Sequence, residues 1–137
     1  MAKKKKTLSK LKYDLQKIFN KFIRLRDLDG DYFTCISCGE TKPKEVLNAG
    51  HFYAVKGYDS MRFNEDNVHG ECVGCNCFNE SHLIGYGINL ELRIGRERVE
   101  ELHELAREYK KNGYKWSRIE LEELIVEYKQ KVKELCR

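Results

Sequence analysis

This 137-residue sequence is poor in long apolar runs, and it holds one proline and one tryptophan. No stretch approaches the ~18 apolar residues that a membrane-spanning helix needs. The lysines near its start are not followed by the apolar segment of a secretory signal. We therefore expect no membrane partner and a protein of the reducing cytoplasm. In that compartment, paired cysteines indicate metal ligands before disulfides.

The composition is that of one small domain with a wide solvated surface. Charged residues make up 35% of the chain and hydrophobic residues 41%, the latter slightly below the globular norm. A chain of this length is too short for two sizeable cores. The sequence predicts a single α+β domain over 1–137, in which a basic helical part (1–30) and a helical part (83–137) flank a central part (31–82).

Positive charges crowd the first fifth of the chain, although the net charge is only +4. A run of four lysines begins at Lys3. Such an arm is either a solvated terminus or the sequence-independent part of a nucleic-acid interface. Lys4, Lys5 and Lys6 are therefore candidate DNA-binding residues.

Apolar periodicity predicts helices on both sides of the central part. Residues 7–29 carry apolar side chains at helical spacing, with lysines on the other face. Two further apolar stripes cover 99–109 and 121–135. Ser117 and Glu120 precede the second of these stripes with the spacing of a capping box. We expect all three stripes to pack in the core.

Two Cys-x-x-Cys pairs, "CISC" and "CVGC", indicate a structural zinc site. Zinc binds four thiolates tetrahedrally, and each pair spans one edge of about 4 Å. Because all four positions are filled, the site has no opening for a substrate. It would hold together a segment too poor in apolar residues to fold by itself. The predicted Zn²⁺ ligands are Cys35, Cys38, Cys72 and Cys75.

Two polar residues beside these pairs have the chemistry of phosphodiester hydrolysis, which needs an activated water and a cation on the phosphate. His51, in "AGHF", can take a proton at neutral pH. Asn76, directly after the second pair, can offer a carbonyl oxygen to a divalent cation. Because the cysteines anchor both the strand with His51 and the helix with Asn76, we expect the two residues to face each other across a small groove. The helix N-terminus would offer N–H groups to a phosphate.

The order of these motifs resembles the HNH, or ββα-metal, nucleases, and within them the NinG/Rap recombination endonucleases of lambdoid phages. The likeness covers "FIRLRD" (22–27), "CISCG" (35–39), "AGHF" (49–52), "RFNEDNVHGECVGCN" (62–76), "LRIGRERVEEL" (92–102) and "KWSRIELEELIVEYKQKVKEL" (115–135). It implies a zinc-stapled, treble-clef-like ββα-metal core flanked by helices. It also implies a metal-dependent endonuclease that cuts branched DNA, such as Holliday junctions or D-loops, during phage recombination in the bacterial host.

The resemblance implies roles for individual residues. His51 would be the general base, Asn67 would brace the strand and loop around it, and Asn76 would bind the catalytic Mg²⁺ or Mn²⁺. In the similar phage endonuclease VII an Asp directly precedes the catalytic His, whereas this chain has Gly50 there. The identity of a further cation ligand is therefore left open, and the candidates are Asn48, Glu80 and His69. Phosphate contacts, with surface charge as the equal alternative, are expected at Arg62, His82, Arg93 and Arg96.

Branched DNA is the expected partner, and the symmetry of a junction favours a homodimer joined through the long helices at both ends. Two other classes of function remain open. A noncatalytic, zinc-stabilised nucleic-acid-binding module would suit the absence of an Asp at Gly50. A helical adaptor in a recombination complex would need neither His51 nor Asn76. Cleavage of branched DNA by the purified chain separates these classes.

Overall fold

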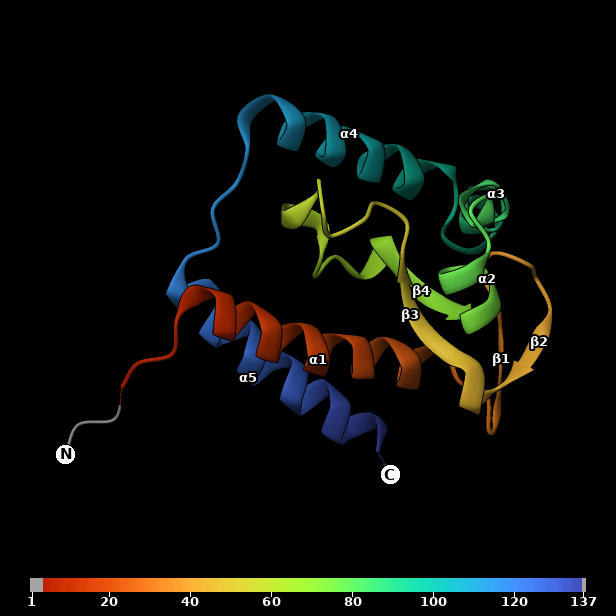
Figure 1. Cartoon of the computed structure of the whole chain (residues 1–137), viewed down its shortest axis with the longest axis horizontal. Coiled ribbons are helices and arrows are strands. Elements are labelled where there is room, and N and C mark those ends of the chain that lie inside the picture. Colours follow the sequence, from red (N-terminus) through yellow and green to blue (C-terminus); the bar gives the residue numbers. More distant parts are fainter. Residues whose placement is uncertain (1–3, 137) are drawn as a thin grey trace.

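The structure is a computed structural model that describes residues 4–136, so Lys3 of the predicted basic arm lies outside the described residues. Within that range, five α-helices and two antiparallel two-stranded sheets form an α+β fold (Figure 1). The predicted fold class is confirmed at this level. Each helix between residues 4 and 136 is too short or too polar to cross a bilayer.

Along residues 4–136, one α-helix precedes the four strands and four α-helices follow them. The helices are α1 (Leu8–Asp27), α2 (Val73–Phe78), α3 (His82–Ile94), α4 (Arg96–Asn112) and α5 (Arg118–Leu135). The strands are β1 (Tyr32–Thr34), β2 (Thr41–Pro43), β3 (Leu47–His51) and β4 (Val68–Cys72). β1 pairs with β2, and β3 pairs with β4. Both pairs are hairpins, and the register of the second sets Asn48 opposite Glu71.

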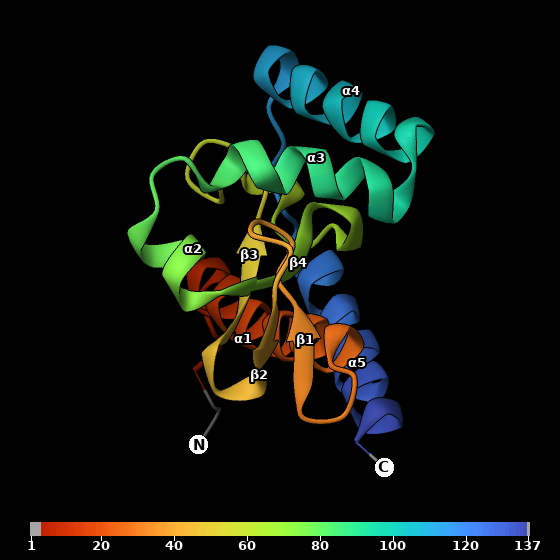
Figure 2. The same ribbon diagram turned by 90° about the vertical axis from the view of Figure 1, so that its right-hand side faces the viewer.

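The first and last helices pack against each other within one chain (Figures 1 and 2). α1 buries Leu15 and Phe19, and the Phe19 ring meets Tyr128 of α5 edge to face, with centroids 4.9 Å apart. α5 begins with the predicted capping box of Ser117 and Glu120, which is confirmed. Because these apolar faces cover each other, the surface expected to join two copies is buried inside the protomer.

A second core forms where α3 and α4 cover the long loop between β3 and β4 (Figure 2). It contains Tyr86 and Leu90 of α3, Leu102 of α4 and Met61 of the loop. Gly95 ends α3 and starts the turn into α4 with a φ of +89°. This conformation is strained for any residue with a side chain, so a glycine there separates the two helices.

The β3–β4 hairpin lies between these two cores. Ala49 and Val68 pack against the α1 side. On the other side, Tyr86 of α3 donates its hydroxyl to the carbonyl oxygen of Gly50 over 2.6 Å. α2 contacts both strands of the hairpin. The strand that ends at His51 is therefore held by helices on both faces.

The helix that carries Asn76 is short. α2 starts at Val73 and stops at Phe78. Asn79 is extended, and its side-chain oxygen accepts the N–H of Ser81 over 3.0 Å, which replaces the next helical turn with a side-chain turn. Glu80, one of the candidate cation ligands, thus lies beyond the helix that carries Asn76.

Candidate functional site

Four cysteines from the turn after β1 and from the β4–α2 junction converge at one point, as their spacing predicts. Their sulfur atoms all lie within 4.8 Å of one another, which fits the ~3.8 Å edge of a tetrahedral site with Zn–S bonds of about 2.3 Å. Cys35 and Cys38 come from the turn after β1, Cys72 ends β4, and Cys75 lies in α2. The cluster could hold a metal ion such as zinc, and it joins the first hairpin to the β4–α2 junction.

The surroundings of the sulfurs match the needs of a metal site. The N–H groups of Cys38 and Cys72 donate to Sγ of Cys35 over 3.5 and 3.3 Å. Burial opposes ionisation of Cys35, but these donors outweigh it and lower its pKa. Burial and the neighbouring Cys72 and Cys35 sulfurs raise the pKa of Cys75. A bound cation would stabilise the ionised sulfurs, because thiolates must be deprotonated to act as metal ligands.

His51 is the last residue of β3, and its ring is oriented by the backbone. Nε2 lies 3.1 Å from the carbonyl oxygen of Arg62. A carbonyl only accepts, so Nε2 carries the proton and Nδ1 is the basic nitrogen. Nδ1 makes no hydrogen bond within residues 4–136 and is not among the buried unpartnered atoms there, so solvent reaches it. Burial lowers the pKa of His51, against the carbonyl contact, which raises it.

Asn67 ties together the loop between β3 and β4. Its side chain is fully buried. Oδ1 accepts the N–H of Tyr53 over 2.8 Å, while Nδ2 donates to the carbonyls of Tyr53 and Met61 over 3.0 and 3.1 Å. Both amide hydrogens are used in this way. The loop that Asn67 closes is the one that carries the Arg62 carbonyl to His51.

The two asparagines expected at the catalytic cation lie near α2. Asn76 is half-buried in α2, and its side chain makes no hydrogen bond within residues 4–136. Nδ2 of Asn48 lies 3.7 Å from Sγ of Cys77 in α2. Side chains alternate along a strand, so His51 shares the face of Ala49 rather than that of Asn48. No hydrogen bond joins His51 to Asn76 in the described range, and their expected facing stays a prediction.

His69, another candidate ligand, has both ring nitrogens engaged by the protein. Nε2 lies 2.9 Å from the carbonyl oxygen of Asp66. Nδ1 lies 3.3 Å from the guanidinium of Arg26 and 3.4 Å from that of Arg93. Burial and the Arg26 charge lower the pKa of His69 to about 4. Its nitrogens are thus committed to holding α1, β4 and α3 together.

Two of the arginines expected at phosphates also make internal contacts. NH1 of Arg62 pairs with Asp59 over 2.9 Å, and only 15% of its side chain is exposed. NH2 of Arg93 donates to the carbonyl oxygen of Thr34 over 3.2 Å. Arg96 lies on the surface, paired with a glutamate one turn further along α4. Of these three, Arg96 is the most available to a phosphate.

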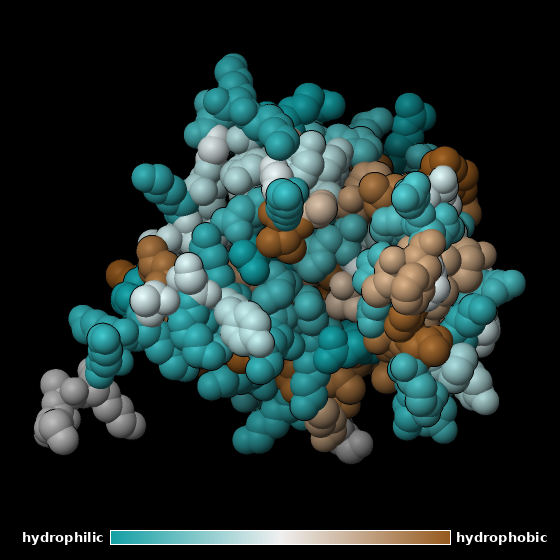
Figure 3. Space-filling model, viewed as in Figure 1, coloured by the Kyte–Doolittle hydropathy of each residue, from teal (hydrophilic) through white to brown (hydrophobic). Residues whose placement is uncertain are grey.

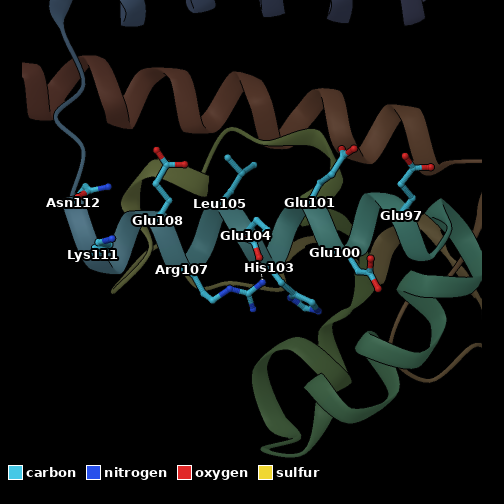
Figure 4. A pocket seen from close by; sticks show the side chains of 10 residues that line it. All are labelled: Glu97, Glu100, Glu101, His103, Glu104, Leu105, Arg107, Glu108, Lys111 and Asn112. Atoms are coloured by element: carbon cyan, nitrogen blue, oxygen red, sulfur yellow. Dashed lines mark hydrogen bonds and ion pairs between the residues drawn. The ribbon is translucent and has the colours of Figure 1, made fainter.

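Charge differs between the two sides of the molecule. The exposed Lys4, Lys5 and Lys6 precede α1, whereas α4 carries a shallow hollow rich in carboxylates (Figure 4). Its charged lining residues are Glu97, Glu100, Glu101, Glu104, Glu108, Arg107 and Lys111. Figure 1 shows α1 and α4 on opposite sides of the β3–β4 hairpin. A polyanion is therefore attracted more strongly to the α1 side than to the carboxylate-rich hollow on α4.

The sequence did not predict the contact between Glu71 and His82. Glu71 is fully buried in β4, and its Oε2 lies 2.5 Å from Nδ1 of His82 at the start of α3. The sequence offers one hint of this contact, which is the carboxylate of Glu71 in "VHGEC". This segment forms β4, and all of its residues are buried. Its partner comes from a later helix, so no local pattern reveals the pair.

Fold and site together define a small α+β protein in which two hairpins and five helices surround a four-cysteine cluster that could hold a metal ion such as zinc. Comparison with known protein families identifies the family of this protein. The family model described as "Bacteriophage Lambda NinG protein" matches residues 1–137. The chain belongs to the NinG family of bacteriophage proteins.

Individual relatives agree with this assignment. The chain is 38% identical to "Protein ninG" of Escherichia phage lambda over 88% of its own length and 54% of the relative. It is 37% identical to "Protein ninG" of Escherichia phage 933W and 36% identical to that of Salmonella phage P22, in each case over 88% of this chain and 55% of the relative. The chain thus spans about half the length of the curated relatives it matches. No solved structure matches it.

Proposed function

We propose that this chain is a metal-dependent DNA endonuclease that cuts branched recombination intermediates such as Holliday junctions or D-loops. His51 is the general base, Asn67 braces its loop, and Asn76 contributes to a catalytic Mg²⁺ or Mn²⁺ site. The single observation that carries the proposal is the ring of His51, which is held by the Arg62 carbonyl with its Nδ1 open to solvent.

Hydrolysis of a phosphodiester requires that the attacking water lose a proton as it reaches phosphorus. Nδ1 of His51 can accept that proton, because Nε2 already carries the hydrogen that contacts Arg62. The lowered pKa keeps the ring unprotonated near neutral pH. A bound divalent cation would supply charge to stabilise the phosphate and the leaving oxygen. The Arg62 carbonyl would stabilise the imidazolium that proton transfer creates.

The order β3–β4–α2 supports the proposal, because ββα-metal nucleases take their base from a strand and a cation ligand from the following helix. Cys72 ends β4 and Cys75 lies in α2. Zinc in this cluster would therefore fix the helix with Asn76 to the hairpin with His51. Its role would be structural, because sulfur fills all four positions.

A homodimer remains part of the proposal, but its surface differs from the expected one. The apolar faces of α1 and α5 are buried within the protomer. An exposed apolar stripe runs along α3 instead, at Ile84, Ile88 and Leu92, which are 62–81% exposed. Figure 3 shows hydrophobic side chains gathered over α2 and α3. A second copy would bury this stripe.

The alternative is a noncatalytic nucleic-acid-binding module stabilised by zinc. It is favoured by Gly50, which puts no side-chain ligand directly before His51. Such a module would use the lysine arm and the cysteine cluster but would leave the DNA intact. The two functions therefore differ in one measurable outcome, which is cleavage.

Purified protein with Mn²⁺ or Mg²⁺ should be tested on labelled four-way, flap and linear duplex DNA. Wild-type protein should cut the branched substrates. His51→Ala should lower the rate by about 10²–10⁴-fold, as loss of a general base does, without changing zinc content or DNA affinity. His103→Ala, which removes a half-buried histidine from α4, is the matched control and should cut normally. Binding without cleavage in any divalent metal would establish the module instead.

Asn76→Ala should behave differently from His51→Ala. It removes an oxygen ligand, so its defect should shrink as the Mn²⁺ concentration rises. His51→Ala should not respond to added Mn²⁺, because the missing group is a proton acceptor. Equal rescue of both variants, or of neither, would contradict the assigned roles.

A further inference from the structure

Glu71 is a carboxylate sealed inside the protein with one oxygen unused. Its Oε2 contacts the hydroxyl of Ser37 and Nδ1 of His82, the latter over 2.5 Å. Oε1 is buried and has no hydrogen-bond partner among residues 4–136. Such an oxygen is costly in either protonation state, because an O–H there would lack an acceptor as well. Its position indicates a ligand other than protein atoms.

Gly50 makes room for this carboxylate. A Cβ at Gly50 would lie 2.2 Å from Oε1 and 2.9 Å from Cβ of Glu71. The backbone of Gly50 is not in the left-handed region, so space and not conformation requires a glycine here. The carboxylate of Glu71 therefore lies against the β3 residue directly before His51. It places a carboxyl group where residue 50 itself has no side chain.

Other donor groups lie around the same carboxylate. His82 supplies a ring nitrogen, and its side chain is 18% exposed, which gives solvent a path to the pair. Ser37 supplies a hydroxyl. Asn48 stands opposite Glu71 in the strand register, so the two side chains leave the same face with Cβ atoms about 5 Å apart. Donors from β3, β4, α3 and the Cys35–Cys38 turn thus converge.

The contact between Glu71 and His82 is compatible with a shared ion. Two ligand atoms held at ~2.1 Å from one cation stand about 3 Å apart. The pair at 2.5 Å would need to open by only about 0.5 Å to reach that separation. Rotation of the partly exposed His82 ring can provide such a movement. The buried Glu71 would not need to move.

We infer that Glu71 and His82 bind a divalent cation, assisted by the Ser37 hydroxyl and the Asn48 amide oxygen. The inference rests on the proposed function in one respect, which is that this ion, bound next to Gly50, is the catalytic one. Mg²⁺ takes oxygen ligands, whereas imidazole suits first-row transition ions. The imidazole among the donors therefore favours a first-row transition ion over Mg²⁺, and Mn²⁺ is a suitable probe because carboxylate and carbonyl oxygens also bind it.

Zinc-loaded protein should be titrated with Mn²⁺ and followed by electron paramagnetic resonance. Wild-type protein should bind one Mn²⁺ per chain beyond its zinc. Glu71→Gln and His82→Asn should each weaken binding by at least about 10- to 100-fold, the range known for lesser changes around metal ligands. The matched controls are Glu91→Gln and His103→Asn, a carboxylate and an imidazole outside the site, and both should bind like wild type. Wild-type affinity in Glu71→Gln and His82→Asn would overturn the inference.

A second measurement avoids any dependence on how the variants fold. In the wild-type protein, substoichiometric Mn²⁺ should broaden the imidazole NMR signals of His82 before those of His69 and His103. Equal or absent broadening would show that Glu71 and His82 form only a buried hydrogen-bonded pair.

The inference and the proposed function fail separately. Mn²⁺ bound at Glu71 and His82 in a protein that cuts no DNA would overturn the endonuclease proposal alone. Cleavage by Glu71→Gln with an unchanged Mn²⁺ dependence would overturn the cation site alone.

Discussion

Asn67→Ala should loosen the loop that orients His51, and the structure sets the size of the effect. The substitution removes the bonding partner of the N–H and the carbonyl of Tyr53, while the Met61 carbonyl keeps a second donor, the N–H of Asn64. Each unsatisfied buried group costs about 1–3 kcal/mol. Because Tyr53 is only half-buried, we expect the lower part of this range, about 2–4 kcal/mol in total.

Thermal unfolding measures this loss. At about 3 °C per kcal/mol for a domain of this size, the melting temperature should fall by roughly 6–12 °C. Asn64→Ala is the matched control, since that residue caps a short turn in the same loop through one bond to Asp66, a loss of about 1 kcal/mol. Asn67→Asp should be no better than alanine, because a carboxylate would face two carbonyls. A melting temperature for Asn67→Ala equal to that of Asn64→Ala would refute this account of the loop.

Three other predictions address the metal, the DNA and the base. Cys72→Ser should release the zinc and unfold the central segment, while Cys136→Ser should leave zinc content and circular dichroism unchanged; a folded, metal-free Cys72→Ser protein would contradict the structural role. Replacing Lys4, Lys5 and Lys6 by Gln should reduce the slope of log K against log salt for DNA binding by up to about 3, whereas the same change at Lys110 and Lys111 on α4 should not. Because burial lowers the pKa of His51 below the ordinary imidazole value of about 6.5, the cleavage rate should fall with pH around a midpoint below that value, where the ring gains a proton; a midpoint above it would show a different base.

Local patterns predicted the parts of the fold that local interactions determine. The apolar period of α1 and the capping box at Ser117 act within one or two turns, so the sequence displays them directly. The four cysteines are recognisable because metal geometry restricts the spacing within each pair. Their grouping needs no knowledge of the rest of the chain.

Contacts between distant segments were not predictable in this way. The packing of α1 on α5 depends on tertiary structure, so the apolar stripes predicted burial but not which helix each one packs against. The end of α2 depends on a side-chain turn at Asn79 that a helical pattern does not reveal. The pairing of Glu71 with His82 joins β4 to α3, and neither residue has a partner at a regular spacing. These contacts decide which groups can reach a cation.

The packing of α1 against α5 also has a consequence for synthesis of the protein on the ribosome. Leu15 and Phe19 pack in one buried cluster with Leu121 and Tyr128, which are translated roughly a hundred residues later. At about 5–20 residues per second, α1 exposes its apolar face for around 5–20 s before its partner emerges. During that interval only the β3–β4 hairpin and its loop can cover α1, and the packing of α1 on α5 forms only after α5 has left the ribosome.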